Sequence, residues 1–164
     1  MEQQVNVSVV QEPSAVQEPS AEVGQGASVK RVPSVVTQIP AANAEQAIAH
    51  FAAKLVYETD CADVHQAMAK KQMDFHLLDV RGAMSFERSH VPGAINMPKE
   101  KISHEALLAL PERDCFVVYC AGPHCNGADK AALKIAQLGF PVKIMIGGIT
   151  GWADEKFRFE GLKA

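Results

Sequence analysis

Short apolar segments alternate with helical patterns over most of the chain, and this alternation limits the fold more than any other feature of the sequence. Segments 75–80, 94–97, 116–119 and 142–146 are short apolar runs bounded by polar or turn residues, so we expect them to form strands. Patterns with helical spacing lie before and between them. Strands that alternate with helices form a parallel sheet with helices on both faces. The sequence therefore predicts a single α/β domain of this kind.

Residues that commonly cap helices mark where the helices should begin. They are Asn43, Asp60, Ser103 and Asn126. Gly139 follows the last of these helical segments as its C-terminal cap, and two glycines at 147–148 precede a final short helix around Trp152. In parallel α/β sheets, ligand sites lie beyond the carboxyl ends of the strands. The residues that follow segment 116–119 are therefore the first place to look for a site.

The first 41 residues differ from the rest in composition. The segment Val10-Gln-Glu-Pro-Ser-Ala15 is followed at once by an identical copy, and the stretch has several prolines and glycines but no aromatic residue. Such a segment buries too little apolar surface to offset the entropy of ordering. We therefore predict a disordered low-complexity tail over residues 1–41 and one folded domain over residues 42–164. A partner-binding or regulatory arm is the alternative interpretation of the tail.

Charge and hydropathy exclude several classes of protein. A net charge of −3 and an isoelectric point near 6.1 provide no basic surface for nucleic acid or anionic membranes. No apolar run approaches the ~18 residues of a membrane span, and the N-terminus lacks the basic and apolar regions of a secretory signal. We therefore expect a cytoplasmic protein with no nucleic-acid or membrane partner, whose cysteines are reduced thiols.

The loop after segment 116–119 carries the residues best suited to chemistry. It begins at Cys120 and continues with Ala121, Gly122, Pro123, His124, Cys125, Asn126 and Gly127. A loop that leads into a helix N-terminus turns several backbone N–H groups toward one centre, where they stabilise an anion. We therefore expect Cys120 to have a pKa below the ~8.5 of a free thiol and to act as a nucleophile. An inert cysteine at a buried strand end is the alternative.

Charged residues near the end of segment 75–80 are interpreted as structural. Asp79 and Arg81 flank the end of a buried strand, where a charge needs a partner, so we expect them to form an ion pair that fixes the following loop. Glu87 and His90 are predicted to form a similar scaffold pair. Lys130 lies just beyond the cysteine loop, as a supporting cation.

Several separate motifs occur in a characteristic order. Leu78-Asp-Val-Arg81 is followed by Phe86-Glu-Arg-Ser-His-Val-Pro-Gly-Ala-Ile-Asn96, Val117-Val-Tyr-Cys120, Leu138-Gly-Phe140, and Gly147-Gly148 with Trp152. Together they resemble the rhodanese-like, or sulfurtransferase, family over most of the segment after residue 41. The resemblance implies a rhodanese fold in which Cys120 carries sulfane sulfur as a persulfide. It also implies a small-molecule sulfur donor, a thiol acceptor that is either small or a protein, and no cofactor.

Two departures from the family pattern bear on the donor. The loop is about two residues longer than the commonest family version, and residues 121–129 include no arginine or lysine, where thiosulfate-using members have one. A thiosulfate dianion would therefore rest mainly on backbone dipoles. The same lack of a loop arginine argues against a phosphatase, which needs one to clamp phosphoryl oxygens. A non-catalytic binding or regulatory module of the same fold is the alternative function.

Cys125 and His124 admit more than one interpretation. Cys125 either lines the loop inertly, resolves a Cys120 persulfide by releasing sulfide and forming a disulfide, or is itself the carrier. His124 either tunes the thiolate or is simply solvated. The four residues between Cys120 and Cys125 suit a zinc site, but no second ligand pair is evident in the sequence, so we expect no metal.

Overall fold

The computed structural model describes residues 32–162. Most of the predicted tail, residues 1–31, therefore lies outside the described residues. Residues 32–41 are all exposed, and the backbone turns at Ser34, whose carbonyl accepts hydrogen bonds from the N–H groups of Thr37 and Gln38 at 3.0 Å each. The residues from Ala42 onward form a compact unit and are described by themselves below.

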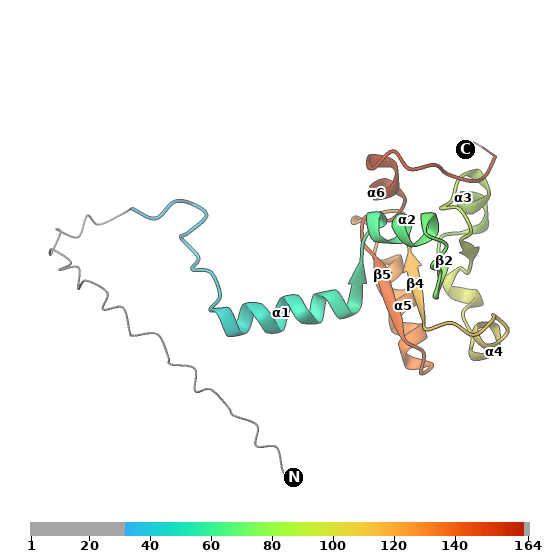
Figure 1. The fold of residues 1–164 in the computed structure, drawn as a ribbon, viewed down its shortest axis with the longest axis horizontal. Coiled ribbons are helices and arrows are strands. Elements are labelled where there is room, and N and C mark those ends of the chain that lie inside the picture. Colours follow the sequence, from blue (N-terminus) through green and yellow to red (C-terminus); the bar gives the residue numbers. More distant parts are fainter. Residues whose placement is uncertain (1–31, 163–164) are drawn as a thin grey trace, which may run out of the picture. The chain divides into compact units, whose positions relative to one another are not determined.

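Within the described residues, the strands form one parallel sheet in the order β1–β5–β4–β2–β3 (Figure 1). The strands are β1 Glu58–Thr59, β2 Phe75–Asp79, β3 Ile95–Asn96, β4 Cys115–Tyr119 and β5 Val142–Met145. The predicted parallel sheet is confirmed, with four strands at the expected places. Strand β1 was not predicted, because its two polar residues follow no apolar pattern.

Helices precede, connect and follow the strands. They are α1 Ala44–Tyr57, α2 Cys61–Ala69, α3 Ala83–Arg88, α4 His104–Leu108, α5 Gly127–Gln137 and α6 Gly148–Asp154, with a 3-10 turn η1 at Lys99–Lys101. The side chains of Asn43, Asp60 and Ser103 each accept a hydrogen bond from the backbone N–H three residues on, as predicted. Asn126 occupies the N-cap position of α5, but its side chain makes no capping hydrogen bond.

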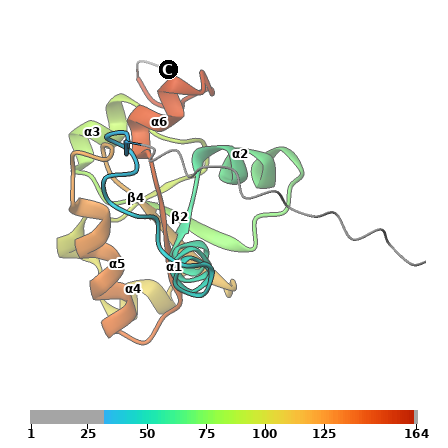
Figure 2. The same ribbon diagram turned by 90° about the vertical axis from the view of Figure 1, so that its left-hand side faces the viewer.

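Two hydrophobic cores lie on opposite faces of the sheet. Leu78 and Val118 point toward α4 and α5, where Ile135 is buried. Their neighbours along the strands face the other way, into the core that α2 and α6 cover. Figure 2 shows α4 and α5 together on one side of the strands and α2 on the other. The predicted arrangement, with helices on both faces, is confirmed.

Helix α1 forms where the sequence predicts it but adds no side chain to either core. Its apolar residues Ile48, Phe51 and Leu55 are 69%, 60% and 73% exposed. Across to β5, the Lys143 ammonium group donates a hydrogen bond to the Leu55 carbonyl at 2.9 Å. The hydrophobic cores that position the site begin only at Cys61, the first residue of α2.

Candidate active site

Cys120 lies directly after β4, at the carboxyl end of a strand that has β5 and β2 on either side. Its side chain is largely buried, at 8% exposed. The carbonyl groups of Cys120 and Ala121 accept hydrogen bonds from the backbone N–H groups of Ile149 at 3.1 Å and Thr150 at 3.0 Å. The first turn of α6 therefore holds the beginning of the cysteine loop in place.

Gly148 permits this close approach between α6 and the loop. Its φ is +56°, and a Cβ added there would overlap the Cys120 carbonyl oxygen and come within 3.0 Å of the Gly122 backbone nitrogen. Any larger residue would push α6 away from the loop. Packing against the loop thus explains the second glycine of the pair, whereas Gly147 is explained by its own φ of +84°.

A tight turn brings the second cysteine back over the first. The Cys125 N–H donates to the Gly122 carbonyl at 3.0 Å, and the Sγ atoms of Cys120 and Cys125 lie 2.8 Å apart. Gly127 leaves room for both sulfurs, because a Cβ there would lie 2.7 Å from the Cys120 Sγ and 3.3 Å from the Cys125 Sγ. The loop therefore brings together two thiols that the sequence places five residues apart.

The two thiols differ in acidity. Burial raises the pKa of Cys120 to about 11, and its hydrogen bond with Cys125 adds to the rise. The same hydrogen bond lowers the pKa of Cys125, and so do the backbone N–H groups of Gly127 and Ala121. The predicted low pKa of Cys120 is therefore wrong for the resting pair. The backbone N–H groups of Gly127 and Ala121 thus favour negative charge on Cys125, which is less buried than Cys120.

The remaining predicted loop residues lie at the surface around this pair. Pro123, His124 and Asn126 are exposed, and Lys130 is exposed on α5. The positive charge of Lys130 contributes to the lowered pKa of Cys125. Lys130 is therefore placed to favour negative charge on Cys125 rather than on Cys120.

A cavity of about 200 Å³ opens beside the two cysteines. Its lining includes both thiols and the carboxylates of Glu58 and Asp129, and none of its lining residues is arginine or lysine. Sequence reasoning did not identify the two carboxylates as site residues. Asp129 could have been assigned to the site from the sequence, because it lies in the first turn of the helix predicted directly after the cysteine loop. Glu58 could not, because it belongs to strand β1, which was not predicted.

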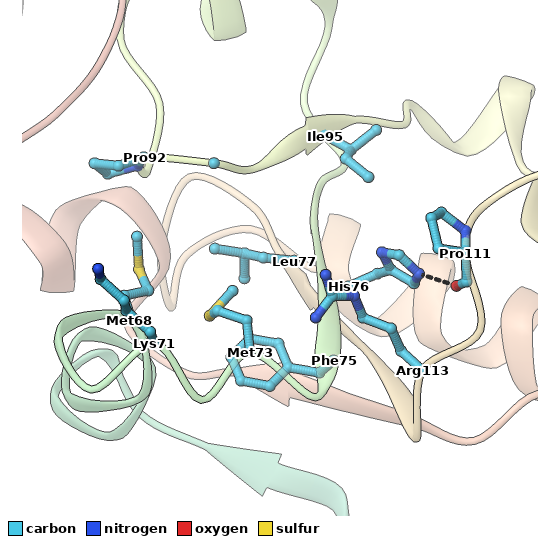
Figure 3. Close-up of a pocket in the computed structure, with 11 residues that line it drawn as sticks. Met68, Lys71, Met73, Phe75, His76, Leu77, Pro92, Ile95, Pro111 and Arg113 are labelled. Carbon is cyan, nitrogen blue, oxygen red and sulfur yellow. Dashed lines mark hydrogen bonds between the residues drawn. The ribbon is translucent and has the colours of Figure 1, made fainter.

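A larger cavity, of about 680 Å³, lies beside the amino-terminal half of β2 (Figure 3). Met68, Leu77 and Ile95 are among its lining residues, and the His76 Nε2 atom lies 2.6 Å from the Pro111 carbonyl oxygen at its margin. It includes neither cysteine of the loop. Size alone therefore does not mark the reactive site.

The predicted ion pair between Asp79 and Arg81 is present. The Arg81 Nη2 atom lies 2.6 Å from Asp79 Oδ2, and the Arg81 Nε atom donates to Asp79 Oδ1 at 3.0 Å. The same Nη2 donates to the Ser89 carbonyl at 2.7 Å, so the pair ties the end of β2 to the segment after α3. Its role is to fix the scaffold beside the site.

The predicted pair of Glu87 and His90 is wrong. The His90 Nε2 atom faces Glu160 instead, at 3.7 Å, and its Nδ1 hydrogen bonds to the Phe86 carbonyl at 2.8 Å. Trp152 is buried among core residues and donates from Nε1 to the Arg158 carbonyl at 2.9 Å. It is not part of the lining of the cysteine cavity.

Residues 32–162 contain neither a candidate metal cluster nor a helix that could span a membrane. No group of three or more His, Cys, Asp or Glu side chains there is arranged to hold a metal ion. No helix in the same range is long and apolar enough to cross a membrane.

Comparison with known proteins decides the family. The family model for the rhodanese-like domain matches residues 60–155, which is more than half of the chain. The chain belongs to the rhodanese-like domain family. The fold and the resemblance inferred from the separate motifs are thereby confirmed.

Curated relatives include proteins named as sulfurtransferases. Thiosulfate sulfurtransferase PspE of Escherichia coli is 30% identical over 84 residues, which cover 51% of this chain and 79% of PspE. The adenylyltransferase and sulfurtransferase UBA4 of Yarrowia lipolytica is 36% identical over 84 residues, 49% of this chain but 21% of UBA4. The HTH-type transcriptional regulator Rv0324 of Mycobacterium tuberculosis is 33% identical over 76 residues, 46% of this chain and 33% of the regulator. The chain therefore spans a third or less of the latter two relatives.

Solved structures with the same fold include a crystal structure of the BH2092 protein from Bacillus halodurans. It is 42% identical to this rhodanese-like chain, covers 74% of it and 88% of its own length, and superposes with a TM-score of 0.70. The solution structure of a rhodanese-like domain from Anabaena sp. is 28% identical, with coverage of 65% and 80% and a TM-score of 0.54. Both structures are similar to this chain over most of residues 42–164.

Proposed function

We propose that this chain is a sulfurtransferase that carries sulfane sulfur as a persulfide on Cys120 and passes it to a thiol acceptor. The observation that carries the proposal is the place of Cys120, at the carboxyl end of β4 in a cavity beneath a loop of backbone N–H groups. Relatives named as sulfurtransferases support the same reaction class. The free thiols suit a reducing compartment, and we propose the cytoplasm.

The cysteine pair supplies the proton transfer that the first step requires. Burial and the hydrogen bond between the two sulfurs, which lie 2.8 Å apart, raise the pKa of Cys120, and the same bond lowers the pKa of Cys125, so Cys125 is the better placed of the two to accept a proton. When a donor enters, Cys125 takes the proton and the Cys120 thiolate attacks the outer sulfur of the donor. The donor S–S bond breaks, and its electron pair leaves with sulfite or a thiolate. An acceptor thiolate then attacks the terminal sulfur of the persulfide and restores Cys120.

The charge of the cavity favours donors other than a dianion. Glu58 and Asp129 are among its lining residues; the Glu58 carboxylate is paired with the Lys54 ammonium group at 3.4 Å, whereas Asp129 forms no ion pair within the described residues. A thiosulfate dianion is therefore repelled more strongly than a persulfide carried by a small thiol or by a protein. We propose a persulfide as the physiological donor, with thiosulfate-to-cyanide transfer as a slower reaction in vitro.

Intact-mass spectrometry of the full chain, quenched with acid after brief exposure to a donor, tests this proposal. A persulfide adds about 32 Da, and we expect the adduct with a low-molecular-weight persulfide and, more slowly, with thiosulfate. It should vanish in Cys120→Ser and persist in Cys125→Ser and Cys115→Ser. An adduct that depends on Cys125 instead would move the carrier site. No adduct from either donor would eliminate the sulfur-carrier function and leave a non-catalytic binding module.

A further inference from the structure

The distance between the two loop sulfurs is close to that needed for a covalent bond. They lie 2.8 Å apart, and a disulfide has an S–S length of roughly 2.05 Å. Bond formation therefore requires a shift of less than roughly 1 Å. The turn closed by the Cys125 N–H and the Gly122 carbonyl already directs Cys125 toward Cys120, and Gly127 leaves the space beside both sulfurs open.

The surroundings make Cys125 the better attacking group of the two. Its side chain is half-buried and lines the cavity, whereas Cys120 is almost fully buried. Backbone N–H groups of Gly127 and Ala121 stabilise negative charge on Cys125. A sulfur anion held beside a persulfide sulfur is the arrangement that thiol–disulfide exchange requires.

The other cysteines of the chain are placed where they cannot compete. Cys61 is buried, and its thiol donates to the carbonyl groups of Ile146 at 3.5 Å and Gly148 at 3.6 Å. Burial also raises the pKa of Cys61 to about 11. Cys115 lies at the amino-terminal end of β4, the opposite end of the strand from Cys120. Cys125 is therefore the thiol in position to react with Cys120.

We propose that Cys125 resolves the Cys120 persulfide, so that the chain releases sulfide and is left with a Cys120–Cys125 disulfide that a dithiol reductant reopens. This inference rests on the proposed persulfide on Cys120. It assigns the chain a second activity, the reductive release of sulfane sulfur as sulfide. The sulfur is transferred to an external thiol acceptor if that acceptor reacts before Cys125, and it is released as sulfide if Cys125 reacts first.

The step balances in atoms and electrons. Cys125 first passes the proton that it took during loading to the terminal sulfur of the persulfide. The Cys125 thiolate then attacks the Sγ atom of Cys120, the Sγ–Sγ bond forms, and the bond from Cys120 to the terminal sulfur breaks. The electron pair of that bond leaves with the terminal sulfur, which departs as hydrosulfide carrying the persulfide proton. The sulfane sulfur is reduced and the two cysteine sulfurs are oxidised. An external dithiol then reduces the protein disulfide by two-step exchange and is itself oxidised to a disulfide.

A single-turnover experiment on the full chain separates this step from sulfur loading. Reduced protein is loaded with a low-molecular-weight persulfide, freed of small molecules in acid, and returned to neutral, thiol-free buffer. We expect wild type to release about one sulfide per loaded chain and to end about 2 Da below the reduced mass, as one disulfide requires. Dithiothreitol should restore the reduced mass. Cys125→Ser and Cys125→Ala should keep the adduct of about 32 Da and release sulfide at least tenfold more slowly, while Cys115→Ser behaves as wild type.

The outcomes distinguish the two proposals. If wild type and Cys125→Ser both load and then release sulfide at equal rates, the resolving role is wrong while Cys120 remains the carrier. If fragmentation of the peptide that carries both cysteines places the extra sulfur on Cys125 of wild type, Cys125 relays sulfur rather than resolving the persulfide, and the inference is again overturned. If neither protein takes up sulfur, the carrier function itself fails, and the resolving role fails with it.

Discussion

The hydroxyl oxygen of Tyr119 accepts a hydrogen bond from the backbone N–H of Val91 at 3.1 Å, inside the core that α2 and α6 cover. Burial raises the pKa of Tyr119, and the negative charge of the neighbouring Asp79 carboxylate raises it further. The hydroxyl therefore stays protonated while it accepts the hydrogen bond from Val91. This bond ties the last residue of β4, immediately before Cys120, to the segment that precedes β3.

Replacing Tyr119 by Phe should lower stability without removing the reactive thiol. The Val91 N–H would lose its buried partner, which costs about 1–3 kcal/mol, so the free energy of unfolding in urea should fall by about that amount. Tyr57→Phe, on an exposed side chain of α1, is the matched control and should change little. An unchanged unfolding midpoint in Tyr119→Phe would show that this hydrogen bond is not needed by the scaffold.

Removal of residues 1–41 should leave the folded unit unaffected. The described part of this segment, residues 32–41, is exposed, and its backbone bonds at Ser34 are made within the segment. We therefore propose that residues 42–164 unfold with the same midpoint and load sulfur at the same rate as the full chain. Thermal unfolding followed by circular dichroism, together with the loading assay, measures both. A midpoint lowered by several degrees would place part of the domain before residue 42.

The protonation state of Cys120 should depend on Cys125. Burial raises the pKa of Cys120 to about 11 and the hydrogen bond with Cys125 adds to the rise, while the same bond lowers the pKa of Cys125. A serine at 125 is neutral and donates to the Cys120 sulfur instead, so the pKa of Cys120 should fall. Alkylation of Cys120 by iodoacetamide is measured from the masses of peptide fragments that contain this residue. The rate of alkylation should rise at a lower pH in Cys125→Ser than in wild type. Cys115→Ser should leave the dependence of the alkylation rate on pH unchanged. A shift of this dependence to higher pH in Cys125→Ser would contradict the proposed effect of Cys125 on the pKa of Cys120.

Gly127 should be needed for the sulfur pair and dispensable for stability. A Cβ at this position would lie 2.7 Å from the Cys120 Sγ, so Gly127→Ala must force the two sulfurs to move. Alanine is favoured over glycine within a helix by about 1 kcal/mol, which offsets much of the strain. We expect sulfide release to fall at least tenfold with the unfolding free energy changed by about 1 kcal/mol or less. Gly82→Ala, where a Cβ meets nothing within 4 Å, is the control.

The sequence predicted those features that depend on local pattern. The strands appear as short apolar runs because both faces of the sheet are covered, so that Val117 and Val118 are both buried. The cysteine loop could be located because Cys120 follows such a strand and precedes a helix. The ion pair of Asp79 and Arg81 was also accessible, since its members are two residues apart.

Features that depend on contacts between residues far apart in the chain could not be predicted from local sequence pattern. The partner of His90 is Glu160, seventy positions further along the chain, and no local spacing points to it. The prediction of a low pKa for Cys120 is wrong because the loop dipoles can be inferred from the sequence, whereas the burial and the sulfur contact that raise the pKa of Cys120 cannot. Strand β1 is a strand only because β5 lies beside it.

The carboxylates of the cavity should set the preference among sulfur donors. Asp129 is exposed on the first turn of α5 and lines the cavity with the two cysteines. Replacing it by Asn removes a negative charge near an incoming dianion, worth about 0.5–1 kcal/mol at low ionic strength. We therefore expect kcat/KM for thiosulfate to rise about two- to fivefold in Asp129→Asn.

The salt and donor dependence of Asp129→Asn separates electrostatics from other effects. The gain should shrink at high salt, because ions screen the carboxylate, and it should be small for an uncharged persulfide donor. Asp114→Asn, which removes an exposed charge just before β4 at the far end of that strand, should leave both donors unaffected. Equal gains for charged and uncharged donors would mean that Asp129 acts through loop geometry, and the acidic cavity would then not explain donor choice.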